Sequence, residues 1–168
     1  MCGGVRRWPG RGSAGSISRM PPDDASSDVR DALAIRALCE RYAQAVDAGD
    51  SAAFSALFTP DGHLVANFLG EVHFYGREQL AQVPVQAHAD AATTMHFIGN
   101  HLAEVDGDSA TGVTYCIANH VRDDRSNLAM MVRYDDRYRR GSDGEWLIAD
   151  RRVDVQWTET RQADPTTE

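Results

Sequence analysis

The sequence of 168 residues has only three cysteines, Cys2, Cys39 and Cys116, and no two of them form a CxxC pair. An odd number of widely separated cysteines predicts neither a disulfide framework nor a structural zinc site. No apolar run approaches the roughly 20 residues that span a bilayer. These absences predict a single cytoplasmic domain in a reducing compartment, with no membrane partner.

Positive charge is also scarce in this chain. The sequence holds 25 acidic and 17 basic residues, which gives a formal net charge of −8 at pH 7. Binding to phosphate groups needs a basic face, so we expect neither a nucleic acid nor an anionic membrane as a partner.

The sequence contains no common cofactor or catalytic motif. There is no GxGxxG, no P-loop, no GxSxG and no HExxH. His63, His73, His88 and His101 show no recognised ligand spacing, whereas a catalytic metal needs about three convergent ligands. We therefore expect no cofactor and no metal, and any chemistry must come from ordinary side chains.

Both ends of the chain differ in composition from the middle. Residues 1–26 are rich in Gly, Ser, Pro and Arg, which predicts a disordered N-terminal extension. An Arg- and Ser-rich, acid-poor start also fits an organelle transit peptide, and Met20 is an alternative start of the protein. We expect the domain at residues 27–158 and a polar C-terminal tail at residues 159–168.

The first half of the domain shows the spacing of helices. Ile35, Leu38, Tyr42 and Val46 recur at helical intervals within "SDVRDALAIRALCERYAQAVDAGD". A short helix, "DSAAFSALF", is stopped by "TPDG", and "HLVANFL" is a probable strand. The segment "GREQLAQVPVQAHAD" predicts a third helix that Pro84 ends or kinks.

From residue 93 the pattern changes to strands. "TTMHFIGNHLAEV" and "SATGVTYCIANHV" are joined by "DGD", and "NLAMMVRYDDRYRR" and "EWLIADRRVDVQW" by "GSDG", so both pairs predict hairpins. Helices followed by antiparallel strands predict an α+β fold. Three N-terminal helices on a strongly curved, mostly antiparallel sheet would enclose a cone-shaped cavity.

His96 is the first candidate for chemistry. Side chains alternate along a strand, so Met95 and Phe97 face one way while His96 and Ile98 face the other. Both faces are partly apolar, and His96 should therefore be buried or line a cavity. It is either a packed core residue or a base held in a pocket.

Asp47 ends the first predicted helix, in "AVDAGD". A carboxylate near a helix C-terminus opposes the helix dipole, and taken alone Asp47 fits a solvated residue beside a glycine turn. If it meets His96, it fixes the imidazole tautomer and leaves the other nitrogen free to take a proton. Such a dyad can remove a proton next to a carbonyl, and elimination or isomerisation follows.

His120, in "YCIANHV", is a second candidate and shares a strand face with Cys116. It fits a general acid that protonates a leaving hydroxyl, and equally a surface histidine at a strand end. Asn119 or Tyr115 would take this polar role, as substrate-binding residues, if the opposite face of the strand points inward.

Tyr42 lies five residues before Asp47. Its hydroxyl can polarise a substrate oxygen, but its helical spacing equally suits a core aromatic residue. We expect the shape of the pocket to depend on the apolar side chains Phe54, Phe68, Met95, Met130 and Trp157.

Three segments of the chain resemble a known family. "IRALCERYAQAVDAGDSAAFSALFTPDG", "TMHFIGN" and "YRRGSDGEWLIADRRVDVQW" are similar to the SnoaL-like branch of the nuclear transport factor 2-like superfamily. The resemblance runs from about Asp28 to Trp157. It implies the α+β cone described above and a homodimer or homotrimer.

Three groups within this superfamily refine the comparison. Asp47, His96 and His120 match the helix-end aspartate and the two strand histidines of scytalone dehydratases. Val46 and roughly Ala66 stand where the water-binding tyrosines of those enzymes would fall, which puts their particular substrate in doubt.

Tyr42 matches a tyrosine of bile-acid dehydratases, although Asn119 or His120 replaces their strand aspartate. Hexachlorocyclohexane dehydrochlorinases share the aspartate–histidine dyad, and Arg139 and Arg140 lie near their basic residue.

The resemblance implies a cofactor-free lyase that uses the dyad as a general base. Its substrate would be a hydrophobic cyclic or polyketide- or steroid-like small molecule. Two alternatives stay open. One is a polyketide cyclase or ketosteroid-type isomerase with the same base, and the other is a non-catalytic module for ligand binding or dimerisation.

Overall fold

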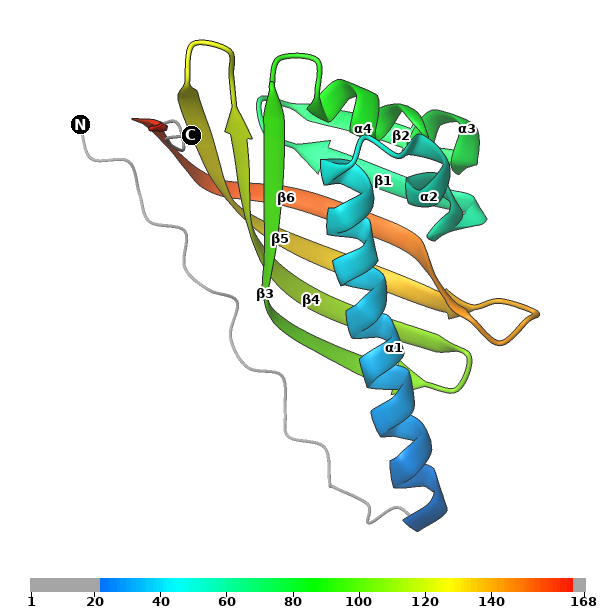
Figure 1. Ribbon diagram of the computed structural model, residues 1–168. Coiled ribbons are helices and arrows are strands. Elements are labelled where there is room, and N and C mark those ends of the chain that lie inside the picture. Colours follow the sequence, from blue (N-terminus) through cyan, green and yellow to red (C-terminus); the bar gives the residue numbers. More distant parts are fainter. Residues whose placement is uncertain (1–21, 165–168) are drawn as a thin grey trace.

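The computed structural model describes residues 22–164, with side chains from residue 27 onwards. Figure 1 shows one long helix in front of a sheet, with shorter helices gathered at one end of it. The helices are α1 (Pro22–Asp47), α2 (Ser51–Ala56), α3 (Gly76–Leu80) and α4 (Gln82–Ala87). The strands are β1 (Phe58–Asn67), β2 (Glu71–Tyr75), β3 (Thr93–Asp106), β4 (Ser109–Val121), β5 (Ser126–Arg140) and β6 (Trp146–Gln162).

The sheet has the strand order β2-β1-β6-β5-β4-β3. β1 pairs with β6 in parallel, and every other neighbouring pair is antiparallel. The sheet is curved and unclosed, and α1 lies across one of its faces (Figure 1). The predicted α+β class, with helices over a strongly curved and mostly antiparallel sheet, is confirmed.

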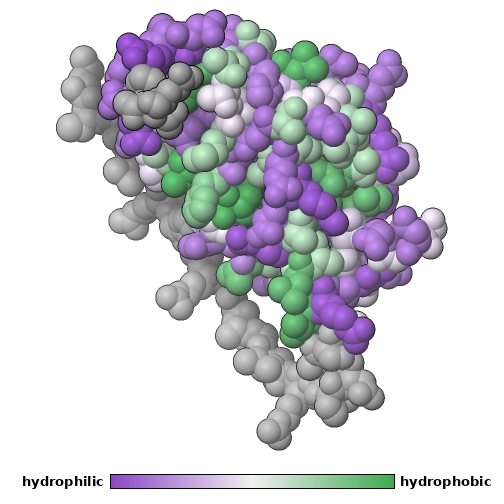
Figure 2. Space-filling view, viewed as in Figure 1, coloured by the Kyte–Doolittle hydropathy of each residue, from purple (hydrophilic) through white to green (hydrophobic). Residues whose placement is uncertain are grey.

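α1 buries the stripe that the sequence predicts. Ile35, Leu38, Tyr42 and Val46 are all nearly inaccessible to solvent and join the central core. Gly49 ends the helix with φ of 66°, a conformation that glycine adopts at little cost. On the face that carries α1, hydrophobic groups are interspersed among hydrophilic ones (Figure 2).

The region between α2 and β3 is more regular than the sequence predicts. The "TPDG" segment lies inside β1, where the pairing with β6 shifts between Phe58 and His63. After the end of β1 at Asn67, the chain turns and forms β2, which pairs with β1. The third helix is divided between Leu80 and Gln82, because the Pro84 ring clashes with the carbonyl four residues earlier.

Two domain boundaries also differ from expectation. α1 begins at Pro22, inside the predicted extension 1–26, and β6 continues to Gln162, inside the predicted tail 159–168. The end of β6 stays ordered because it pairs with the first residues of β5, from Ser126 onwards. Residues 1–21, including the alternative start Met20, lie outside the described residues. No helix within residues 22–164 is long and apolar enough to cross a membrane.

Candidate active site

The sheet face that meets α1 carries His96. Met95 and Phe97 are 59% and 61% exposed, so they point outward, while Ile98 packs against the core. Across the sheet His96 pairs with Ala118, and Ala118 pairs with Met130. These three residues form a row on the inner face.

Asp47 and His96 are brought together in the structure. The Nδ1 atom of His96 lies 2.6 Å from Oδ1 of Asp47, and the backbone N–H of His96 donates to Oδ2 at 2.9 Å. Only 9% of the His96 side chain and 25% of the Asp47 side chain are exposed. A carboxylate only accepts hydrogen bonds, so Nδ1 carries the hydrogen and Nε2 keeps its lone pair. This geometry is that of a base with an oriented partner.

Thr94 is a residue of this site that the sequence reasoning missed. Its hydroxyl donates to Oδ1 of Asp47 at 2.9 Å, and its side chain is buried. Thr94 lies two residues before His96 on the same strand, so strand alternation places both on one face. That spacing is the signal that was available in the sequence.

His88 closes the same corner from the end of α4. Its Nε2 atom donates to the backbone carbonyl of Val46 at 2.9 Å and lies 3.4 Å from the Thr94 hydroxyl. An open cleft of about 480 Å³ begins at His88, between the turn before β3 and the turn after β4. His88 is thus shared between this cleft and the contact with Thr94, which in turn contacts Asp47.

Asp47 is ionised at neutral pH. Burial acts to raise the pKa of this carboxyl group, but the hydrogen bonds from His96, its charge, and the hydroxyl of Thr94 outweigh burial and lower the pKa. An ionised Asp47 would stabilise the imidazolium that forms when His96 takes a proton.

His120 is beside the dyad, but it is not a protonated acid. Its ring meets the His96 ring edge-on, with centroids 5.7 Å apart. Burial lowers the pKa of His120 to about 4, and the electrostatic interaction with the imidazoles of His96 and His88 acts in the same direction. The imidazole is therefore neutral at pH 7. Its one N–H can donate a hydrogen bond, but the ring lacks the second proton that a general acid would transfer.

Tyr42 is a core aromatic residue, which is one of the two roles that the sequence allowed for it. It is 4% exposed, and its ring lies 4.8 Å from that of Phe54 and 5.7 Å from that of Tyr134. The Arg151 guanidinium lies over the ring, and burial raises the pKa of Tyr42 to about 12. The hydroxyl of Tyr42 thus belongs to the core.

The predicted pocket-lining residues separate into different surroundings. Met130 lies on the inner row and packs against the core. Phe54 is fully buried between Tyr42 and Phe58, which makes it a core residue. Phe68 lies in the turn between β1 and β2 and is 46% exposed, outside the buried interior.

Three other predicted binding residues lie on the outer face, which corrects the expectation. Tyr115 is 44% exposed, and Asn119 accepts a hydrogen bond from Asn127 on that face. Trp157 is 58% exposed because β6 carries one extra residue opposite β5: Val132 pairs with Val155, and Met131 with Trp157. That bulge turns Trp157 away from the interior.

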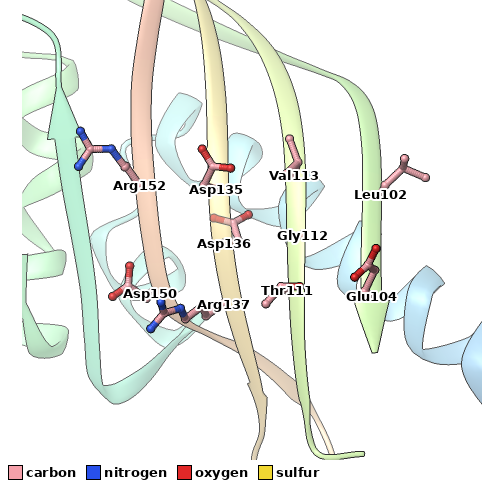
Figure 3. A pocket seen from close by; sticks show the side chains of 10 residues that line it. All are labelled: Leu102, Glu104, Thr111, Gly112, Val113, Asp135, Asp136, Arg137, Asp150 and Arg152. Atoms are coloured by element: carbon pink, nitrogen blue, oxygen red, sulfur yellow. The ribbon is translucent and has the colours of Figure 1, made fainter. Parts of the chain in front are cut away.

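Two of the open grooves on the outer face differ in their lining. The larger, of about 610 Å³, is lined by charged side chains such as Asp135, Arg137 and Arg152 (Figure 3). A second, of about 460 Å³, is lined by apolar side chains that include Phe97 and Trp157. Neither groove contains a residue of the dyad. The homodimer or homotrimer implied by the resemblance stays a prediction.

The arginines of the last hairpin form ion pairs. Arg139 pairs with Asp61, and Arg140 with Asp31 at 2.7 Å and Asp108 at 3.1 Å. These contacts join the hairpin to α1, to β1 and to the turn between β3 and β4. Neither arginine reaches the dyad through any of these contacts.

A second buried polar cluster lies under α1. Arg151 binds both oxygens of Asp136 at 2.7 Å, and both side chains are fully buried. Tyr138 donates to Asp136 at 2.6 Å, and the Cys39 thiol lies 3.3 Å from the Tyr138 hydroxyl. Because the charges are paired and hydrogen-bonded, the cluster fits a structural role.

Among the described residues, no group of three or more His, Cys, Asp or Glu side chains is arranged to hold a metal ion. The nearest approach to one is on the sheet edge, where Nε2 of His63 lies 3.0 Å from Nδ1 of His73. His63 also donates to Asp150 at 3.2 Å. The two imidazoles contact each other and do not converge on a point where a metal ion could lie.

Comparison with known proteins places the chain among its relatives. Residues 27–152 match the model of a SnoaL-like domain. An uncharacterized protein of Mycobacterium tuberculosis, Rv2910c, is 30% identical over 133 residues, which cover 77% of this chain and 88% of that protein. The structure of Rv3472 from the same species, a protein of unknown function, is 28% identical with a TM-score of 0.68, covering 83% and 78%.

Two further solved structures show the same fold at lower identity. A scytalone dehydratase-like protein from Novosphingobium aromaticivorans is 20% identical with a TM-score of 0.69, covering 87% of this chain and 97% of that one. A hexachlorocyclohexane dehydrochlorinase, LinA-type3 from Novosphingobium barchaimii, is 15% identical with a TM-score of 0.71, with the same coverage. The sequence segments, the curved sheet and the matched model agree: the chain belongs to the family of SnoaL-like domains.

Proposed function

We propose that this chain is a cofactor-free lyase that carries out a dehydratase-type elimination. The substrate class is a hydrophobic cyclic molecule of polyketide or steroid type with a hydroxyl group beta to a carbonyl. The observation that carries the proposal is the 2.6 Å contact between His96 Nδ1 and Asp47. It leaves Nε2 of a nearly buried imidazole as the free base.

The reaction follows from this arrangement. Nε2 of His96 takes a proton from the carbon next to the carbonyl, and the electrons of that C–H bond form the enolate. The carbon–carbon double bond then forms as the C–O bond breaks. The proton on Nε2 passes to the departing hydroxide, so water leaves and the base is restored. Asp47 stays ionised and stabilises the imidazolium in between.

A second candidate is an isomerase that uses the same base. The neutral state of His120 is compatible with it, because a pKa of about 4 leaves no separate protonated acid beside His96 at pH 7 and His96 alone carries the proton. An isomerase needs none, because the proton taken from one carbon returns to another carbon from the same Nε2. The product distinguishes the two reactions, since only the elimination releases water.

The test is turnover of a panel of cyclic beta-hydroxy ketones and unsaturated ketosteroids, followed by the absorbance of the conjugated enone. We expect His96→Ala and Asp47→Asn to keep the fold and lower the rate by roughly 10²–10⁴-fold, the usual contribution of a general base. Phe97→Ala, one residue away on the outer face, is the matched control. Unchanged rates in either dyad variant would refute the proposed base.

A further inference from the structure

Thr94 makes a contact with Asp47 that the proposed reaction does not by itself require. We propose that Thr94 is a positioning residue that holds the Asp47 carboxylate in place while the His96 ring gains and loses its proton. This inference rests on the proposed function, in which Asp47 and His96 act together.

The carboxylate of Asp47 accepts three hydrogen bonds, and they come from two residues. Oδ1 accepts from His96 Nδ1 at 2.6 Å and from the Thr94 hydroxyl at 2.9 Å, while Oδ2 accepts from the His96 backbone N–H. Both oxygens are therefore occupied. Rotation of the carboxylate about its Cβ–Cγ bond would break all three contacts at once.

Thr94 differs from the other donors in one respect. The Nδ1–H bond moves with the His96 ring, and the backbone N–H holds only the opposite oxygen, Oδ2. Of these three bonds, only the one from Thr94 fixes Oδ1 independently of the ring. Oδ1 is the oxygen that orients the ring, so Thr94 defines where the imidazole must return after each proton transfer.

The direction of the Thr94 hydroxyl is itself determined. His88 Nε2 lies 2.9 Å from the carbonyl of Val46, and a carbonyl only accepts, so Nε2 carries a hydrogen. That N–H is also 3.4 Å from the Thr94 oxygen, which can therefore only accept from this side. The Thr94 hydrogen is left for Asp47, the acceptor on its other side.

The backbone and the side chain of Thr94 are both rigid. The residue pairs with His120 across β3 and β4, and it is 6% exposed. A β-branched side chain has few rotamers, so little entropy is lost in keeping the hydroxyl aimed at Asp47. Serine keeps the hydroxyl without the branch, whereas valine keeps the shape without the hydroxyl.

The test uses the free, full-length chain, so it needs no substrate. Nitrogen-15 NMR of the histidine rings reports the tautomer of His96 and the exchange rate of its Nδ1 hydrogen with water. We expect Thr94→Val to populate both tautomers and to speed exchange at least ten-fold, whereas Thr94→Ser keeps the wild-type spectrum. Thr94→Cys, which retains a weak donor, serves if the valine variant does not fold.

Thr114→Val is the matched control. Thr114 is another fully buried inner-face threonine, and its hydroxyl lies 2.9 Å from a different imidazole, Nδ1 of His101. This variant should leave the His96 signals unchanged. If Thr94→Val gives the wild-type tautomer and exchange rate, Thr94 does not position the dyad and the proposal is overturned.

Turnover provides the second arm on any substrate found. Thr94→Val should lower kcat by roughly ten- to a hundred-fold, as happens when an oriented histidine loses an outer partner, with little change in KM. Thr94→Ser should restore kcat. A changed His96 tautomer or exchange rate in Thr94→Val, combined with unchanged turnover in His96→Ala, would support the positioning role and reject the proposed lyase. The failure of one proposal can therefore be distinguished from the failure of the other.

Discussion

The two faces of the central sheet are built from adjacent residues of the same strands, yet they differ in kind. The inner row joins His96, Ala118 and Met130 under α1, and its one polar side chain, His96, is paired with Asp47. The outer row, displaced by one residue, is bulky and consists of Phe97, Ile117, Met131 and Trp157. All but the partly buried Met131 are exposed. Both faces carry apolar side chains, so apolar content does not distinguish them. The inner face is distinguished by the paired polar groups that it buries.

The largest difference between the faces should appear in two neighbouring aspartates of β5. Asp136 points inward to a fully buried pair with Arg151, while Asp135 points outward to Arg133. Asp136→Ala leaves a buried charge unpaired and should lower the free energy of unfolding by about 3–5 kcal/mol. Asp135→Ala, at a partly exposed pair, should cost about 0–1 kcal/mol. Urea unfolding of both variants measures the contrast, and equal losses would contradict it.

A smaller effect concerns the pH dependence of His120 on the inner face. Its pKa is lowered to about 4 in the folded chain, below the value near 6.5 in the unfolded chain. The unfolded state therefore takes up its proton first as the pH falls. The stability that neutral His120 contributes is present above pH 6.5 and is lost between pH 6.5 and about 4.

Thermal unfolding at several pH values tests this loss. His120→Gln should flatten the fall in Tm between pH 6.5 and 4 relative to the wild type. Direct NMR titration of the His120 ring should show it still neutral at pH 5.5. A ring that titrates near 6.5 would remove the argument that His120 lacks a proton to give.

Asp47 should show a loss of stability in the same direction, in a window at lower pH. Its pKa is lowered in the folded chain, because the contacts from His96 and Thr94 outweigh burial. Its contribution to stability is thus present above the ordinary aspartate pKa of about 3.9 and is lost as the pH falls through the lower folded value. The Tm difference between the wild type and Asp47→Asn should therefore shrink below about pH 4. A difference that is constant down to pH 2 would show that the ionised carboxylate is not what stabilises the site.

Much of the inner face was predictable from local pattern, and the rest depended on pairing. Strand alternation correctly grouped His96 with Ile98 and His120 with Cys116. It could not decide which group faces α1, because both faces of β3 and β4 are partly apolar. Tyr115 belongs to the group that turned out to face solvent.

Bulges and long-range contacts explain the remaining errors. Trp157 was expected inside, but one extra residue in β6 reverses the alternation, and a bulge depends on the partner strand. The meeting of Asp47 with His96 spans 49 residues and rested on the family resemblance rather than on spacing. Thr94 was overlooked because its role depends on an Asp47 carboxylate that only the fold brings to it.

The smallest and most specific contrast uses two methionines side by side. Met130 lies on the inner row next to Ala118, and Met131 lies in the apolar groove of the outer face. Both are partly buried, so truncation to alanine should reduce stability in each case by a similar amount, of the order of 1 kcal/mol. Their effects on substrate should differ. If the inner face binds the substrate, Met130→Ala changes KM several-fold on an active substrate, whereas Met131→Ala leaves both kcat and KM within about two-fold of the wild type. A change in KM confined to Met131→Ala would move the binding site to the outer groove, because the two side chains share a strand, a size and a chemistry and differ only in the face they occupy.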